Sequence, residues 1–548
     1  MNSIWNKNYQ AFKTRFPQLA ELTGSEPVPP ESVWSLEQAK NGMITASENG
    51  VSGAANSAGG AVTATSVRLH SAYNPEREAA GAVGRDEVFQ KSAVVFYGFG
   101  LGYHVIEYAK AAAARLSSGQ PVPRLILIEP DVKHFFAAMS VLDWTPVFAL
   151  EQLVIAVGCP ADSVLPLLED ASVVNVGETG VSDSYFFDIP YFTAHAAQYF
   201  NDVRSIVKRN QRKNEINAAT LKKFGKLWCR NSLKNLGRMK ELAGIAGLEG
   251  CASQIPFLIL GAGPSLETIL PYIKELQERT VTVCVETALH TLLRAGVQPD
   301  FILLTDPQFW AYRHIAGLRA PQSVLITEVS AYPSVFRFPC RQLLLCGSQF
   351  PVGQYFEKQL GLTPGDLGTG GSVASCAWNF AHFCGATEIF TAGLDLAFPE
   401  KQTHIRGSSA EQTWHTLSSR LTAPDKFTAG SLYSANAMAA RDYNGRPVLT
   451  DSRMKMFAWW FESRLAGCPE TKTYTLCPQG LAVPGIQPAE FSELLARPSI
   501  KEFKTRLLTR VQELTPLAAG KEAALDALTA GFPQNDFLQT FPFLKEYL

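Results

Sequence analysis

The turn in the segment "PFLILGAGPSLE", residues 256–267, has the residue types and spacing of an anion-binding site. Gly261 and Gly263 follow a short apolar run and precede a helical pattern, and glycines in that position let the backbone approach a ligand closely. We expect the amides of Ala262, Gly263 and Ser265, the Ser265 hydroxyl and the helix dipole to converge on a phosphate. The alternative is a tight strand–helix turn without a ligand. The segment lacks the Gly-Lys-[Ser/Thr] ending of a Walker loop and the third glycine of the dinucleotide fingerprint.

A second glycine-rich segment, "GTGGSVA", precedes another predicted helix. Gly370 and Gly371 expose the first amides of that helix, and Ser372 either caps it or binds a ligand. The strand that follows leads to Gly393 and Asp395. Because ligands of open α/β sheets lie beyond the carboxyl ends of the strands, we expect Asp395 at the same site. The alternative for Asp395 is a cap or turn residue.

Further side chains are candidates for general acid–base catalysis or for binding a sugar. Asp306 ends the run "VQPDFILLTDP", where its carboxylate either binds a sugar hydroxyl, a base amine or a metal, or forms an Asx turn before proline. His404 follows Asp395 in a polar, glycine-containing stretch, and His415 lies further along. An imidazole titrates near neutral pH, so we predict His404 as the general base, His415 as the second candidate and Asp395 as the third. The alternative is that these are ordinary surface histidines.

A weaker signal lies earlier in the chain. Gly98, Gly100 and Gly102 precede a predicted helix and stand roughly thirty residues before Glu129, which is the outline of an adenosine-binding unit. The usual separation is about 20 residues, and tight packing of a helix on a strand explains the glycines equally well. Without a nucleophile or a metal-binding spacing nearby, we expect a structural or acceptor-binding domain with no chemistry of its own, and no metal site.

Composition narrows the class of protein. A chain of 548 residues suggests about three domains. A net charge of −1 favours neither nucleic acid nor membrane, and no run approaches the ~18 apolar residues of a membrane span. The first residues lack the apolar core of a secretory signal. The ten cysteines are scattered without a Cys-x-x-Cys pair, which predicts buried free thiols and a cytoplasmic location.

Alternating β-rich and helical runs predict the α/β class. We expect a Rossmann-like central domain with a mostly parallel sheet, preceded by a second α/β domain and followed by a helical C-terminal region. A helical segment with twelve Lys or Arg and one acidic residue, residues 204–240, is predicted to bridge the domains; a solvated or anion-facing bridge is favoured over a nucleic-acid-binding helix. The predicted division is 1–203 N-terminal domain, 204–245 basic helical linker, 246–487 central catalytic domain and 488–548 C-terminal helical region.

These residues together resemble the motility-associated factor (Maf) flagellin glycosyltransferases, whose central domain is also called 6-hydroxymethylpterin pyrophosphokinase MptE-like. The matching segments are "LGAGPSL", "GVQPDFILLTDP", "GTGGSVA", "GLDLAF" with His404, "YNGRPVLTDSRMKMFAWWFE" and "CPQGLAVPGI". Earlier, "LHSAYNPEREA", "YGFGLGYHV" and "LIEPD" are similar to the N-terminal domain of that family. The resemblance covers most of the chain.

The central domain of that family is similar to bacterial sialyltransferases that use CMP-activated sugars. The resemblance therefore implies transfer of a sialic-acid-like sugar, of the pseudaminic or legionaminic type, from CMP to Ser or Thr of flagellin, without a required cofactor. The residues implied to bind the nucleotide sugar are Gly261, Ala262, Gly263, Ser265, Asp306, Gly370, Gly371, Ser372, Gly393 and Asp395. Two alternatives remain: a Mg·ATP-dependent pterin pyrophosphokinase, in which Asp306 or Asp395 binds Mg²⁺, and a non-catalytic flagellar assembly factor that binds flagellin through the basic helices.

Overall fold

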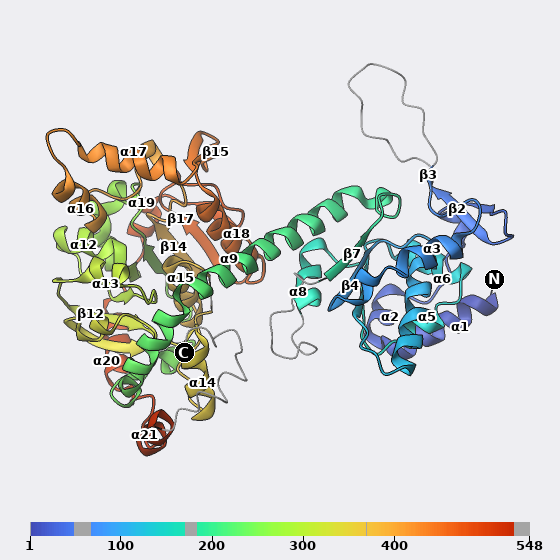
Figure 1. Cartoon of the computed structure of the whole chain (residues 1–548). Coiled ribbons are helices and arrows are strands. Elements are labelled where there is room, and N and C mark those ends of the chain that lie inside the picture. Colours follow the sequence, from blue (N-terminus) through green and yellow to red (C-terminus); the bar gives the residue numbers. More distant parts are fainter. Residues whose placement is uncertain (1, 49–66, 170–183, 369, 531–548) are drawn as a thin grey trace. The chain divides into compact units, whose positions relative to one another are not determined.

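A computed structural model describes residues 2–48, 67–169, 184–368 and 370–530. The chain forms two compact units, Met1–Ala219 and Thr220–Leu548, here called unit 1 and unit 2. The boundary between them falls within the long helix α9 (Ala197–Asn235), so the predicted basic helix is present as one element (Figure 1). The finer division into four parts stays a prediction, and residues 531–548 of its last part lie outside the described residues.

Unit 1 contains a four-stranded parallel sheet in the order β6-β5-β4-β7. Its strands are β4 (Ala93–Tyr97), β5 (Arg124–Glu129), β6 (Leu153–Val157) and β7 (Ser184–Asp188). Phe96 packs into one hydrophobic cluster and Val95 into another, because successive side chains of a strand point to opposite faces. Both faces of the sheet are therefore covered, as expected for parallel strands with continuous apolar runs.

Helices and a small antiparallel sheet complete unit 1. The helices include α1 (Asn2–Arg15), α5 (Tyr103–Ser117) and α6 (Val132–Val141). The small sheet contains β1 (Ser35–Gln38), β2 (Ile44–Glu48) and β3 (Val67–Arg68). An aromatic contact joins two of these helices: the Phe12 ring of α1 lies edge-on to Phe135 of α6, with centroids 5.3 Å apart.

Unit 2 is built on a nine-stranded parallel sheet in the order β18-β17-β14-β9-β10-β11-β12-β13-β8. The strands are β8 (Ala243–Gly244), β9 (Phe257–Leu260), β10 (Val281–Val285), β11 (Phe301–Leu303), β12 (Ala320–Thr327), β13 (Cys340–Leu345), β14 (Glu388–Ala392), β17 (Lys472–Thr475) and β18 (Ile486–Pro488). From β9 the chain adds strands on one side up to β13, and then returns to place β14 on the other side of β9. This reversal makes the space between β9 and β14 a topological switch point.

Helices cover both faces of this larger sheet (Figure 1). Leu258 of β9 joins a core with α12 (Glu286–Arg294), α13 (Phe309–Ile315) and α14 (Pro351–Gln359). The adjacent Ile259 joins a second core. The helices of that second core include α15 (Val373–Phe383), α18 (Ser452–Ala466) and α20 (Lys501–Gln512). The predicted α/β class with a Rossmann-like, mostly parallel central sheet is confirmed.

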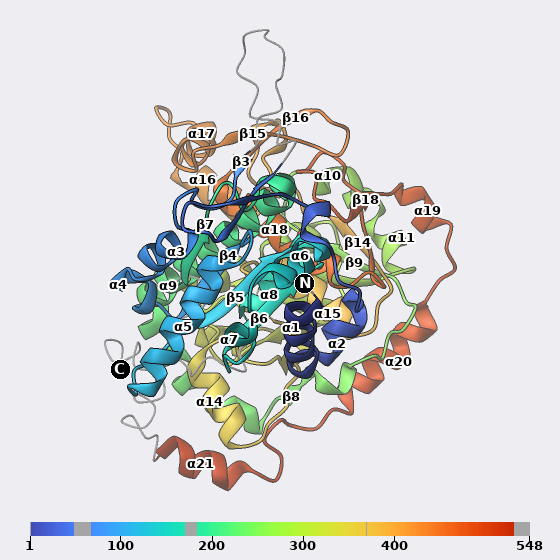
Figure 2. The same ribbon diagram turned by 90° about the vertical axis from the view of Figure 1, so that its right-hand side faces the viewer.

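The last described helices belong to the same body as the sheet. They are α19 (Phe491–Leu495), α20 and α21 (Glu522–Ala530), and they follow the periphery of unit 2 (Figure 2). Leu494 and Leu525 pack into one core of the sheet and Leu507 into the other. No helix among the described residues has both the length and the apolar character needed to cross a membrane.

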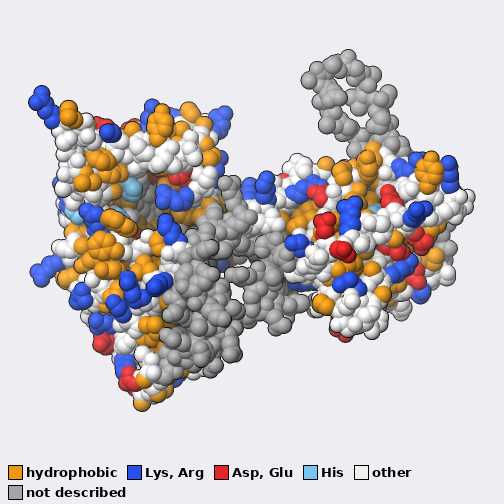
Figure 3. All heavy atoms as spheres, viewed as in Figure 1, with side chains coloured by type: hydrophobic (Ala, Val, Ile, Leu, Met, Phe, Trp, Pro, Cys, Tyr) orange, Lys and Arg blue, Asp and Glu red, His pale blue; other side chains and the backbone are white. Residues whose placement is uncertain are grey.

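Between β14 and β17 the chain forms an outgrowth. It contains α16 (Ser409–Leu417), α17 (Pro424–Ser434) and the hairpin of β15 (Met438–Arg441) and β16 (Pro447–Thr450). The surface of unit 2 is hollowed beneath α17, with histidine and acidic side chains at the hollow (Figure 3). A cavity of about 460 Å³ opens in this outgrowth and is lined by Ser431, Ser434, Ala435, Asp451, Ser452 and Arg453.

Candidate active site at the carboxyl edge of the larger sheet

Two glycine turns meet at the switch point, one after β9 and one after β14. The Gly261 amide donates to the Ala392 carbonyl at 2.8 Å, and the Gly263 amide donates to the Gly393 carbonyl at 2.9 Å. A Cβ atom on Gly263 would lie 2.6 Å from the Gly393 carbonyl oxygen and equally close to Cγ of Asp395, closer than side chains tolerate. The glycines are therefore needed for the two turns to touch each other.

Asp395 belongs to the turn after β14, and its side chain holds the turn after β9 in place. Its carboxylate accepts a hydrogen bond from the Ser265 amide at 3.0 Å and another from the Ser265 hydroxyl. The side chain is buried, and burial raises its pKa to about 6, although the two bonds from Ser265 favour the ionised form. The position of Asp395 beyond β14 agrees with the prediction, but its contacts are those of a residue that positions the turn.

These contacts correct one part of the sequence-based hypothesis. We expected the amides of Gly263 and Ser265 and the Ser265 hydroxyl to converge on a phosphate, but Gly393 and Asp395 accept all three hydrogen bonds. The helix that follows, α10 (Leu266–Ile269), has only four residues and so provides little dipole. The tight-turn alternative describes these donors better, because acceptors about 130 residues away in the sequence already occupy them.

The loop that carries His404 crosses the same turn. The Ile405 amide donates to the Ala262 carbonyl at 2.8 Å, and the Arg406 amide donates to a carboxylate oxygen of Glu267 at 3.0 Å. These two bonds fix the loop over the start of α10. The loop that carries His404 is therefore held beside the glycine turn, and the role of His404 as the base stays a prediction.

The electrostatic state of His404 differs from the expectation. Burial lowers the pKa of its imidazole to about 4, and the nearby positive charges of His314 and Arg453 act in the same direction. The ring lies edge-on to Trp414, with centroids 6.4 Å apart. At neutral pH the imidazole is thus uncharged and able to accept a proton, but it is a weaker base than an ordinary histidine. A bound anion that neutralised Arg453 would raise its pKa.

His415 lies on α16 and is mostly exposed, with 62% of its side-chain surface accessible. Its Nε2 is 4.0 Å from the carboxylate of Glu411, one helical turn earlier. This is the geometry of a surface pair on one helix. Among the described residues no contact joins His415 to the glycine turn, whereas the loop of His404 is joined to it through Ile405.

Two acidic residues stand at the ends of neighbouring strands. Glu286 directly follows β10 and Asp306 follows β11. Glu286 is buried, and burial raises its pKa to about 8, with the charge of Asp306 adding to the shift. Its Oε2 has no hydrogen-bond partner among the described residues. Burial also raises the pKa of Asp306, and Gln308 donates to it at 2.9 Å through its amide, which is the Asx turn considered from the sequence.

Glu286 was missed by the sequence analysis. Its signal was the same as that of Asp306, an acid immediately after a buried apolar run, "VTVCV". Two neighbouring acids with raised pKa values are characteristic of sites that use one carboxyl group in its protonated form.

The start of α15 adjoins this acid pair. Ser372 caps the helix: its hydroxyl accepts from the Ser375 amide at 3.2 Å, so the capping alternative describes it. The Cys376 sulfur in the first turn lies 3.8 Å from the Thr305 hydroxyl, next to Asp306. Gly370 allows the chain to pass against the Ser375 side chain, and Gly371 has a φ of +74°, which favours glycine.

Comparison with known proteins identifies this unit. Residues 230–401 match the sequence model of the family described as 6-hydroxymethylpterin diphosphokinase MptE-like. A solved structure, the Maf glycosyltransferase from Magnetospirillum magneticum AMB-1, is similar with a TM-score of 0.55 and 15% identity; the match covers 93% of this chain and 78% of that one. The chain carries an MptE-like domain in the fold of a Maf glycosyltransferase. The resemblance drawn from the sequence is confirmed.

Relatives in Treponema pallidum (strain Nichols) are uncharacterized proteins. One is 36% identical over 230 residues, which make up 37% of this chain and 58% of the relative. Another is 30% identical over 213 residues, 38% of this chain and 68% of the relative. The chain thus spans between half and about two thirds of the length of these relatives.

The MptE-like domain contains most of the site. Both glycine turns, Glu286, Asp306 and the start of α15 lie within residues 230–401, whereas His404 and His415 follow the matched segment. Assignment of a nucleotide sugar to these residues stays a prediction.

Proposed function

We propose that this chain is a glycosyltransferase that moves a sialic-acid-like sugar, of the pseudaminic or legionaminic type, from CMP to Ser or Thr hydroxyls of flagellin. The observation that carries the proposal is the pair of acids at the carboxyl edge of an MptE-like domain, buried Glu286 and half-buried Asp306, both with raised pKa values. The similarity in fold to a Maf glycosyltransferase supports the reaction class.

In this proposal Glu286 acts as a proton or hydrogen-bond donor. Its pKa of about 8 keeps the carboxyl group protonated at neutral pH, and one of its buried oxygens has no hydrogen-bond partner among the described residues. When the bond between the sugar and the phosphate of CMP breaks, negative charge grows on the leaving phosphate. A neutral carboxylic acid stabilises that charge in the transition state more than in the ground state.

The acceptor hydroxyl also needs a group that takes its proton. Neutral His404, on the loop fixed across the glycine turn, is our candidate for this role. His415 is the second candidate. Asp395 positions the Ser265 turn instead of taking the proton, because both its oxygens already accept hydrogen bonds. No resident cofactor is needed for these steps.

The test is transfer by the purified full chain. CMP release from a CMP-activated nonulosonic sugar is measured with and without flagellin, and the flagellin mass is then determined. Glu286→Gln keeps the shape of the side chain and should lower turnover by roughly 10²–10⁴-fold with CMP affinity retained. The matched control is Glu388→Gln. Glu388 begins β14, at the amino ends of the strands and thus away from the site, and pairs with Arg497 at 2.6 Å, so turnover should be unchanged. Equal turnover in wild type and Glu286→Gln would refute the role of Glu286.

A second function is favoured by the description of the family. An MptE-like diphosphokinase transfers pyrophosphate from Mg·ATP, and Glu286 with Asp306 would then hold the Mg²⁺ ion as oxygen ligands. AMP release from Mg·ATP and 6-hydroxymethylpterin, without CMP release from a CMP-sugar, would favour this function. Neither reaction, together with binding of flagellin, would favour an assembly factor.

A further inference from the structure

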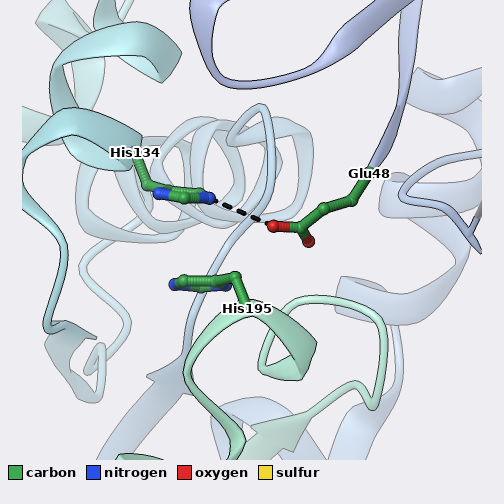
Figure 4. Close-up of side chains that lie close together, drawn as sticks. All are labelled: Glu48, His134 and His195. Carbon is green, nitrogen blue, oxygen red and sulfur yellow. Dashed lines mark hydrogen bonds and ion pairs between the residues drawn. The ribbon is translucent and has the colours of Figure 1, made fainter. Parts of the chain in front are cut away.

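A cluster of histidine and acidic side chains lies in unit 1, near the carboxyl end of β5. Glu48 ends β2, His134 lies in the first turn of α6, and His195 lies in the short 3-10 turn before α9. The two imidazole rings are stacked and the Glu48 carboxylate faces them (Figure 4). One ligand atom from each residue lies within 4.8 Å of the others. Three segments far apart in the sequence thus converge on one point.

The distances fit a shared ion. His134 Nε2 lies 3.3 Å from Oε1 of Glu48. Two ligands of a tetrahedral zinc ion lie about 3.4 Å apart, because each bond is about 2.1 Å long. The nitrogen of His134 and the oxygen of Glu48 therefore already have the separation of two ligands of one ion.

Two further carboxylates lie next to the imidazole rings: Glu129 makes a hydrogen bond, whereas Asp131 lies at ion-pair distance without a hydrogen bond to His134. Oε1 of Glu129 lies 2.8 Å from His195 Nε2, and Oδ2 of Asp131 lies 3.1 Å from His134 Nδ1. Histidines that bind metals almost always contact a carboxylate or carbonyl through their other ring nitrogen, which orients the ring and increases its basicity. With Nδ1 of His134 facing Asp131, its Nε2 faces Glu48 and the interior of the cluster.

The cluster has an excess of negative groups. Glu48 and Glu129 are 7% and 1% exposed, so their charges need a positive partner. The cluster therefore attracts positive charge, and a proton and a metal cation compete for the same nitrogens.

The space at the cluster suits one ion. The cavity there has a volume of about 10 Å³, and its walls include the apolar side chains of Trp34, Leu69 and Phe192. This is the space of about one water-sized sphere, so a nucleotide does not fit. The glycines nearby serve packing: Gly98 and Gly102 have φ values of +64° and +98°, and a Cβ on either would overlap Phe192 or Trp144.

The outline of an adenosine-binding unit was the weaker alternative from the sequence, and it does not fit this site, because His195 occupies the Glu129 carboxylate and the cavity is too small. The expectation that this domain has no metal site stays untested. No pattern in the sequence indicated the cluster, because only tertiary folding brings Glu48 and His195 to His134.

We propose that Glu48, His134 and His195 bind one divalent transition-metal ion of the zinc class, with Glu129 and Asp131 orienting the two imidazoles. Two imidazoles and a carboxylate favour Zn²⁺, Co²⁺, Ni²⁺ or Fe²⁺ over Mg²⁺ and Ca²⁺, which prefer oxygen ligands only. The ion links β2, α6 and the turn before α9, and so fixes the small antiparallel sheet to the parallel sheet of unit 1.

The test uses the full chain after removal of metal with a chelator. Titration with Co²⁺ should saturate at one equivalent and give visible bands of nitrogen and oxygen ligands without a thiolate charge-transfer band, and Zn²⁺ should displace the Co²⁺. Glu48→Gln and His134→Gln should each weaken binding more than 100-fold, and Glu129→Gln about 10–100-fold, the usual effect of an outer carboxylate. Circular dichroism verifies that each variant is folded.

The control separates this cluster from a second one. His382, Cys468 and Glu470 also place ligand atoms within 4.8 Å of one another, but that group includes a thiol. His382→Gln should leave binding unchanged. Three outcomes would each overturn the proposal and leave the cluster as a network of ion pairs. They are a thiolate band that disappears in Cys468→Ala, equal binding by wild type and folded Glu48→Gln, and no stoichiometric binding by the wild type.

Discussion

Replacement of Glu286 by glutamine should increase stability while it removes activity. The pKa of Glu286 is raised from an ordinary 4.5 to about 8, so the folded protein keeps a proton that the unfolded chain releases. Above pH 4.5 the folded state therefore loses stability as the pH rises, by about 1.4 kcal/mol for each pH unit, until the pH passes about 8. Between pH 4.5 and 7 this amounts to about 3 kcal/mol, an order-of-magnitude figure. Glutamine does not titrate and escapes this loss.

The expected result is a difference in stability that depends on pH. At pH 5 the wild type and Glu286→Gln should melt within about a degree of each other, whereas at pH 7 the variant should melt roughly 5 °C higher. Differential scanning calorimetry of the full chain in buffers from pH 5 to 8 measures this, and the transition of unit 2 is assigned by hydrogen exchange of β10 peptides, because a chain with two units need not unfold in one step.

A matched variant tests the cause. Glu328 follows β12 and is also buried with a pKa of about 7, but Ser330, Ser348 and Gln349 all donate hydrogen bonds to its carboxylate. Glu328→Gln turns an amide group toward these donors and should lower stability at pH 5. Because the pKa of Glu328 is also raised, this deficit should shrink as the pH rises toward 7. A constant difference between Glu286→Gln and wild type from pH 5 to 8 would refute the reasoning, since it would mean that Glu286 is not held in its protonated form.

Three further predictions concern the switch point. Gly263→Val should lower the free energy of unfolding by about 1–3 kcal/mol, because its Cβ overlaps Asp395 and Gly393. Calorimetry with CMP measures whether the folded variant still binds nucleotide. Unchanged CMP affinity would show that the turn is not part of the nucleotide site. Asp395→Asn should leave a buried donor facing the Ser265 amide and lower the melting temperature. An unchanged melting temperature would mean that Asp395 does not hold the Ser265 turn in place. His404→Ala should lower transfer roughly 10²–10⁴-fold with CMP binding intact, as measured by the intact mass of flagellin, whereas normal modification in His404→Ala but not in His415→Ala would assign the base to His415.

Local pattern was enough to predict the central strands of unit 2, but not β8, β18 or the β15–β16 hairpin. The apolar runs "FLIL", "VTVCV" and "TEIFTAG" are strands of one parallel sheet, because continuous β-rich runs between helical segments have few other ways to bury both faces. The start of α15 at Ser372 and the long helix α9 were also predictable, since caps and helical periodicity are local properties.

Only the order of the strands decided the contacts of each polar residue. β14 returns to the side of β9, and this places Asp395 on the Ser265 amide and hydroxyl before any ligand can reach them. Adjacent strands likewise put Glu286 beside Asp306, and burial then shifts both pKa values. Residue types and spacing thus determined the elements and the edge where chemistry would lie. Strand order, long-range contacts and loss of water decided which donors remain free and which acids keep their protons, because these depend on neighbours distant in sequence.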